Sequence, residues 1–162
     1  GNFLLLTGGG GSGGGGTEDA ARRRPSLRDA KLGLIDFGQC KSLTLEQRLS
    51  LARLVVAVAD DDDKEIIRVL REEYGIGADG GQASDWFLEK IGRFAFGEFN
   101  SRLTDGKSLR DFSKSLAESY KNNAIPGDLY LPMRTSIMLR GLGLLLNCYV
   151  CPAKSWQSMA EA

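Results

Sequence analysis

From Thr44 to the end of the chain, apolar residues recur at the spacing of an α-helix in one segment after another. Thr44 with Gln47 three residues later is a capping-box pattern, which predicts the start of a first helix that ends near Ala59. The same periodicity predicts further helices over about 60–74, 84–99, 108–120 and 132–147. Gly75 is expected to end the second helix as its C-cap, and Ser84 to cap the start of the third. The chain is therefore predicted to be mainly α, with about five helices in this region.

The last of these segments, 132–147, is the most apolar. Arg134 and Arg140 interrupt its apolar run well short of the length of a membrane span, so we expect it to be the central helix of the core. The third helix carries a stripe of aromatic residues: Trp86, Phe87, Phe94 and Phe99. Large aromatic side chains are usually buried, and we expect this face to pack in the core rather than to bind a cofactor.

Two short apolar runs near the start of the chain, 2–7 and 32–38, are bounded by turn-forming residues and are predicted to be strands. Between them, eight of the 21 glycines of the chain fall in 8–16. Such a sequence behaves as a flexible coil. We therefore expect one β-hairpin with a disordered glycine-rich insert at about 8–30. Because two strands alone bury little apolar surface, the hairpin needs a further partner.

The composition excludes several classes of function. The 162 residues include no histidine, so a Ser-His-Asp hydrolase or a His-ligated zinc enzyme cannot be built from this chain alone. Its 21 basic residues balance 21 acidic ones, which argues against general nucleic-acid binding as the main activity. We expect no nucleic-acid partner and no transmembrane segment in this chain.

Two polar side chains fall at one end of the predicted hairpin. Because the chain reverses between the strands, Asn2 at the start of the first strand lies beside Asp36 at the end of the second. Amide and carboxylate oxygens suit a hard cation such as Mg²⁺, which takes its remaining ligands from water and substrate phosphates. We therefore predict that Asn2 and Asp36 bind magnesium at the phosphate end of a nucleotide site.

Three other sequence patterns resemble metal-binding or modification sites, but each has a better explanation as ordinary structure. Cys148 and Cys151 form a lone Cys-x-x-Cys, which lacks the ligands of a closed zinc site. The acidic run 60–63 lacks the glycine and glutamate register of a calcium loop, and we expect a solvated helix start there. The basic run 22–26 resembles a phosphorylation site for basophilic kinases or a contact for an anionic surface, but a solvated linker is the better interpretation.

The residues around the two candidate ligands resemble motifs of the protein-kinase-like fold. Gly-Asn at 1–2 is similar to the end of a kinase catalytic loop, and Asp-Phe-Gly at 36–38 is similar to the magnesium-binding motif of kinases. The chain then passes almost directly into the helix at Thr44, without a long activation segment. In this it resembles the UbiB/AarF-like atypical kinases, the "activity of bc-one complex" family.

This resemblance implies that residues 1–162 are part of a protein-kinase-like C-terminal lobe: one β-hairpin followed by about five helices. It implies that Asn2 and Asp36 bind Mg²⁺ and ATP in an intact kinase or ATPase. It also implies a role in quinone or other isoprenoid-lipid metabolism in a plastid or mitochondrion, with a nucleotide and isoprenoid lipids or quinone-biosynthesis proteins as partners.

The family's catalytic aspartate and its phosphate-pairing lysine would both precede Gly1. We therefore expect no catalytic residue within this chain and no phosphoryl transfer by the chain alone. A different interpretation stays open, in which the chain is a non-catalytic helical interaction module or a pseudokinase. The two interpretations differ in whether nucleotide binds in a magnesium-dependent way.

Overall fold

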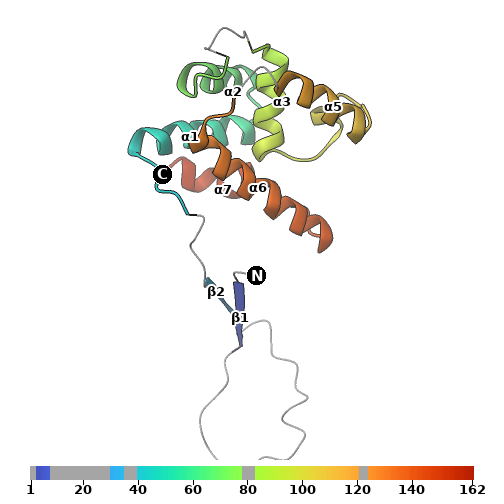
Figure 1. Cartoon of the computed structure of the whole chain (residues 1–162). Coiled ribbons are helices and arrows are strands. Elements are labelled where there is room, and N and C mark those ends of the chain that lie inside the picture. Colours follow the sequence, from blue (N-terminus) through green and yellow to red (C-terminus); the bar gives the residue numbers. More distant parts are fainter. Residues whose placement is uncertain (1–2, 8–29, 35–39, 78–82, 121–123) are drawn as a thin grey trace, which may run out of the picture. The chain divides into compact units, whose positions relative to one another are not determined.

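The computed structural model describes residues 3–7, 30–34, 40–77, 83–120 and 124–162 (Figure 1). By its internal contacts the chain divides into two compact units, Gly1–Cys40 and Lys41–Ala162. Each unit is described by itself. The described residues of the second unit form helices joined by turns and loops, with no strand among them.

In the first unit, the strands β1 (Phe3–Thr7) and β2 (Ala30–Leu34) pair in antiparallel fashion. Their register places Phe3 opposite Leu34 and Thr7 opposite Ala30. Within the described residues this sheet has two strands and no third neighbour. The predicted glycine-rich insert lies outside the described residues over 8–29, and so does the basic run 22–26.

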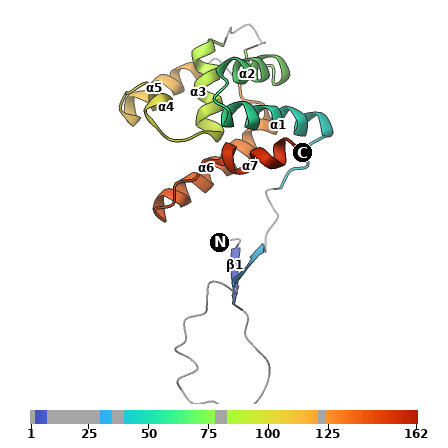
Figure 2. The ribbon, with the colours of Figure 1, turned by 180° about the vertical axis from the view of Figure 1, so that it is seen from behind.

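The second unit is built around α3, which contacts most of the other helices of the unit. Figures 1 and 2 show α3 in the middle of this unit, with α1, α2, α5 and α6 around it. The elements in chain order are α1 (Leu45–Ala59), α2 (Asp63–Arg68), the π-helical segment η3 (Val69–Glu73), α3 (Asp85–Phe96), α4 (Ser101–Thr104), α5 (Leu109–Tyr120), α6 (Gly127–Leu145) and α7 (Pro152–Ala160).

The predicted fold class was wrong as a description of one domain. We expected a hairpin and about five helices in a single kinase-like lobe, but the described residues of the helical unit contain no strand, seven α-helices and η3. The chain is mainly helical, as predicted. The two unpredicted helices are short: α4 is a single turn, and α7 has nine residues that begin with Pro152. Periodicity is a weak signal over such lengths.

The starts of two helices follow the predicted capping chemistry. The hydroxyl of Thr44 accepts the backbone N–H of Gln47 at 3.2 Å, and the Gln47 side chain accepts the N–H of Thr44 at 3.0 Å, so the capping box is present. Ser84 caps α3 by accepting the N–H of Phe87 at 3.2 Å. Gly75 follows η3 with a φ of 65°, a conformation in which glycine is favoured. These predictions are confirmed.

The core lies around α3, where eight of twelve residues are buried. Phe87 and Phe96 have no exposed surface. Of the predicted aromatic stripe, Phe87 is buried and Trp86 and Phe94 are partly buried. Phe99 is 44% exposed, because α3 ends at Phe96, before the stripe is complete. The prediction of a buried aromatic face is therefore confirmed for the part of the stripe that lies on the helix.

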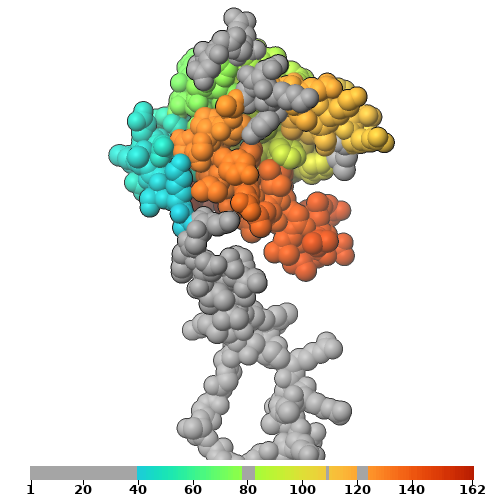
Figure 3. Space-filling model, viewed as in Figure 1, coloured from blue at the N-terminus to red at the C-terminus, as the bar shows by residue number. Residues whose placement is uncertain are grey.

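The prediction that 132–147 forms the central core helix was wrong. The corresponding helix, α6, starts at Gly127 and buries one face, with Leu129, Met133, Ser136, Arg140 and Gly143. The opposite face exposes Met138, Leu142 and Leu145 by 63%, 54% and 82%. A helix that is apolar all round reaches the centre of a core only when both faces are covered. Figure 3 shows the C-terminal end of α6 projecting from the helical unit.

Candidate functional site

The predicted magnesium ligands, Asn2 and Asp36, lie outside the described residues. The strand pair next to them in the sequence is described, and Phe3 pairs with Leu34 in it. Asn2 directly precedes Phe3, and Asp36 follows Leu34 by two residues. Both candidate ligands are therefore attached to the same end of the strand pair. Magnesium binding by these two residues stays a prediction.

Within the described ranges, no group of three or more His, Cys, Asp and Glu side chains is arranged to hold a metal ion. Cys148 is exposed and Cys151 is half-buried, and both are free cysteines. The Sγ atom of Cys151 lies 3.9 Å from the carbonyl oxygen of Phe96. Among the described residues, no further His, Cys, Asp or Glu side chain joins the two cysteines in a group that could hold a metal ion.

The acidic run 60–63 lies where α1 passes into α2, and two of its carboxylates pair with arginines. Arg93 of α3 is only 6% exposed; its Nη1 lies 2.5 Å from Oδ1 of Asp61, and its Nε lies 3.0 Å from Oδ1 of Asp63. Arg102 reaches the same two carboxylates at 3.2 and 3.0 Å. The sequence predicted the helix start but not these ion pairs, because Arg93 follows Asp61 by 32 residues.

The two arginines hold the carboxylates in their ionised form. The hydrogen bond from Arg93 is the main cause that lowers the pKa of Asp61. Burial raises the pKa of Asp63, but the hydrogen bonds and charges of Arg93 and Arg102 outweigh it, so the pKa of Asp63 also lies below its usual value. At neutral pH both carboxylates are therefore engaged by arginine and have no proton to donate. We interpret this cluster as a structural link between the α1–α2 corner, α3 and α4.

A second buried cation on α3 is paired in the same way. Lys90 is 3% exposed, and its Nζ lies 2.6 Å from a carboxylate oxygen of Asp105. Asp105 also accepts a hydrogen bond of 2.8 Å from the indole N–H of Trp86. The hydrogen bond from Lys90 is the first cause that lowers the pKa of Asp105. This pair satisfies a charge inside the core, and we assign it a structural role.

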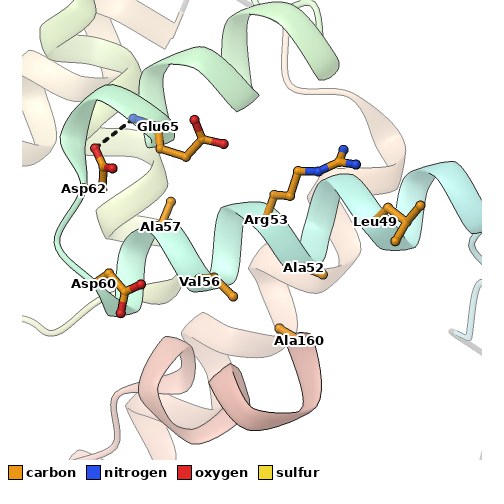
Figure 4. A pocket seen from close by; sticks show the side chains of 9 residues that line it. All are labelled: Leu49, Ala52, Arg53, Val56, Ala57, Asp60, Asp62, Glu65 and Ala160. Carbon is orange, nitrogen blue, oxygen red and sulfur yellow. Dashed lines mark hydrogen bonds between the residues drawn. The ribbon is translucent and has the colours of Figure 1, made fainter. Parts of the chain in front are cut away.

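A hollow of about 320 Å³ lies along α1, beside the start of α2 and the end of α7 (Figure 4). Its lining combines apolar and charged residues: Leu49, Ala52, Arg53, Val56, Ala57, Asp60, Asp62, Glu65 and Ala160. Arg53 donates to Glu73 at 2.9 Å, and Asp60 accepts from Gln157 at 2.9 Å. In Figure 4 Asp62 accepts the backbone N–H of Glu65, which caps α2. These groups hold the helices together, and they do not form a nucleophile and base pair.

The chain matches none of the protein-family models, curated proteins and solved structures with which it was compared. In the part of the chain that the structure describes, no helix is long and apolar enough to cross a membrane. The kinase-like interpretation therefore depends on the sequence motifs around Asn2 and Asp36 and on the register of the strands that connect to them.

Proposed function

We propose that this chain supplies two magnesium ligands, Asn2 and Asp36, to the Mg-ATP site of a UbiB-like atypical kinase or ATPase. The observation that supports the proposal is the β1–β2 register, in which Phe3 lies opposite Leu34. This register connects the Gly-Asn and Asp-Phe-Gly motifs to the same end of one strand pair. Two such motifs at one end of a ribbon form a more specific pattern than either motif alone.

The two ligands have distinct roles in this proposal. Asp36 supplies a full negative charge and Asn2 a neutral oxygen, and both are hard ligands of the kind that Mg²⁺ prefers. The remaining positions of the metal belong to water and to phosphate oxygens, whose charge the metal neutralises. The family resemblance implies that the catalytic aspartate and the phosphate-binding lysine come from outside residues 1–162. The chain alone is therefore expected to bind nucleotide poorly and to transfer no phosphoryl group.

The wider biological setting of the proposal comes from the same family resemblance. It is a role in quinone or other isoprenoid-lipid metabolism in a plastid or mitochondrion, with an isoprenoid lipid or a quinone-biosynthesis protein as partner. The motifs support the nucleotide chemistry more directly than they support this setting, because they contain the metal ligands themselves.

The test uses a chain extended upstream of Gly1 by the catalytic loop and N-terminal lobe that the proposal requires. Asp36→Asn removes the charged metal ligand, and we expect magnesium-dependent ATP turnover to fall by about 100-fold or more. Asp85→Asn is the matched control, because Asp85 is an exposed carboxylate at the start of α3 and its side chain is 74% exposed. Turnover should be unchanged in the control.

Two results would count against the proposal. Wild-type turnover by Asp36→Asn would show that Asp36 is not the metal ligand. A longer chain that binds ATP equally with and without Mg²⁺, and turns none over, would refute the kinase or ATPase function as a whole.

The second candidate function is a non-catalytic helical interaction module. The observation that favours it is the open apolar face of α6, because exposed contiguous apolar surface is typical of binding sites. This function predicts that neither residues 1–162 nor the extended chain binds nucleotide more tightly with Mg²⁺ than without it. A nucleotide titration with and without Mg²⁺ therefore separates the two candidates.

A further inference from the structure

A second cavity of about 320 Å³ opens at the C-terminal end of α6. Its walls come from three segments that are distant in the sequence: the loop after α3, the end of α6, and the loop before α7. Four of its lining residues are apolar or aromatic: Phe99, Leu144, Tyr149 and Val150. The size is within the range of small-ligand pockets, which are usually apolar with a few polar groups. We name this cavity the α6 pocket.

The loop that closes one side of the α6 pocket is fixed by the end of the helix. Asn147 adopts a φ of 53°, and the N–H of Cys148 donates to the carbonyl oxygen of Gly143 at 2.8 Å, as in a Schellman motif. A side chain at position 143 would not fit, because a Cβ there would lie 2.5 Å from the carbonyl oxygen of Cys148 and 3.1 Å from a methyl of Val150. The wall of the pocket is therefore held against α6 by its own backbone.

Arg140 lines the α6 pocket and is only 7% exposed. Its Nη1 donates to the carbonyl oxygen of Gly97 at 2.7 Å, its Nη2 donates to that of Phe94, and its Cζ lies 5.7 Å from the centre of the Phe94 ring. These partners are neutral. A guanidinium has five N–H groups, so two carbonyl oxygens leave donors for a further acceptor.

In the described part of the chain, Arg140 has no carboxylate partner. Because Arg140 is almost fully buried, its charge is poorly solvated, and this burial is the main cause that lowers the pKa of Arg140. Glu98 also lines the pocket, but one of its carboxylate oxygens lies 3.1 Å from Nζ of Lys154 and is paired there. The α6 pocket therefore combines apolar walls with a buried positive charge that has no carboxylate partner among the described residues.

We propose that the α6 pocket binds a small amphiphile with one carboxylate and an alkyl chain. The carboxylate binds the free N–H groups of Arg140, since paired N–H groups match the two oxygens of a carboxylate. The chain lies against Leu144 and Tyr149, which are 52% and 92% exposed, and continues toward Leu145 at the exposed end of α6. This proposal is independent of the magnesium site.

The test measures the affinity of the whole chain for decanoate by calorimetric titration at neutral pH, below the micelle concentration. Acetate has the carboxylate without the chain, and decanol has the chain without the charge. We expect decanoate to bind and each of the other two to bind about tenfold or more weakly, because each lacks one of the two groups that the pocket recognises.

Two variants locate the site. Leu144→Trp fills the pocket from a half-exposed position and leaves Arg140 in place, so decanoate affinity should fall about tenfold or more. Met138→Trp introduces the same side chain at a 63% exposed position of α6 outside the pocket, and affinity should be unchanged. The proposal is overturned if decanoate does not bind, if decanol binds as tightly as decanoate, or if Leu144→Trp keeps the wild-type affinity. The ligand comparison needs no variant and stands even if Leu144→Trp folds poorly.

Discussion

Two helices of the same unit, α3 and α6, show that apolar content alone does not decide which helix forms the core. α3 contains charged residues, yet most of its surface is buried, and its buried cations Lys90 and Arg93 are paired with carboxylates. α6 has the more apolar sequence, yet it buries a polar pair, Ser136 and Arg140, on its inner face. In the described part of the chain the hydroxyl of Ser136 has no hydrogen-bond partner.

The difference comes from the pattern of each helix and from its neighbours. α3 lies among helices on several sides, so its charges must be satisfied by residues that reach it from α2, α4 and the following turns. α6 is covered mainly by α3 and α7 on one side, and its other side stays apolar and open. An exposed apolar face of this kind is typical of protein-interaction sites and ligand-binding grooves.

The largest expected effect comes from truncating one large apolar side chain on each helix. Phe96→Ala on α3 should lower the free energy of unfolding by about 3–5 kcal/mol, because Phe96 has no exposed surface and its loss leaves a cavity. Leu145→Ala on α6 should change it by less than about 0.5 kcal/mol, because Leu145 is 82% exposed. Urea denaturation followed by circular dichroism measures both values. Similar losses of stability in the two variants would show that α3 and α6 do not differ in burial as described.

A smaller effect is expected from adding volume at one glycine on each helix. At Gly92 of α3 a Cβ would lie 2.6 Å from a methyl of Ile66, so Gly92→Val should destabilise the chain by about 1–3 kcal/mol through overpacking. At Gly141 of α6 a Cβ meets open space, so Gly141→Val should change stability by less than about 0.5 kcal/mol. Thermal unfolding of the two variants measures the difference. If the Gly92→Val variant unfolded at the wild-type temperature, α3 would be packed less tightly against Ile66 than the structure shows.

The third prediction concerns the ion pairs of α3. Arg93→Met should lower the free energy of unfolding by about 1–2 kcal/mol at pH 7, less than for a fully buried pair, because Asp61 and Asp63 are more than a third exposed and keep Arg102. The pKa values of both aspartates are lowered in the folded chain. Their contribution is therefore present above their unfolded pKa of about 3.9 and is lost as the pH falls through the lower folded values.

The pH dependence gives this prediction a second measurement. The stability difference between wild type and Arg93→Met should shrink as the pH falls below about 3.9, where the carboxylates become protonated. Arg110→Met on the exposed side of α5 is the control and should show no such change. A difference that is constant from pH 7 to acidic pH would mean that Arg93 stabilises the fold by packing alone.

Local features of the fold were predictable from the sequence, and long-range features were not. The caps at Thr44 and Ser84 depend on residues within three positions, and both were predicted. The exposed face of α6 depends on which helices cover it, so its apolar sequence misled the prediction. The partners of Arg140 precede it by 43 and 46 residues, and no periodic pattern joins them.

Of the two candidate sites, one was predictable from local sequence and the other was not. The magnesium ligands Asn2 and Asp36 were predicted from short motifs, and these residues lie outside the described part of the chain. The α6 pocket was not predicted, because it forms only where the loop after α3 meets the loop before α7. The available signal was Arg140 itself, one of two charges in an otherwise apolar segment, and together with Arg134 it was taken only as a sign that the segment does not span a membrane.

Amide hydrogen exchange along the whole chain, with and without decanoate, tests most directly whether α3 is the buried core helix and the end of α6 an open binding surface. We expect the buried amides of α3 to exchange only by global unfolding of the helical unit. The amides at the end of α6, over 142–145, should exchange about 100-fold or more faster than those of α3. Decanoate should slow exchange at the end of α6 and in 148–151. Equal protection of α3 and α6 without ligand, or no change on adding decanoate, would contradict the account.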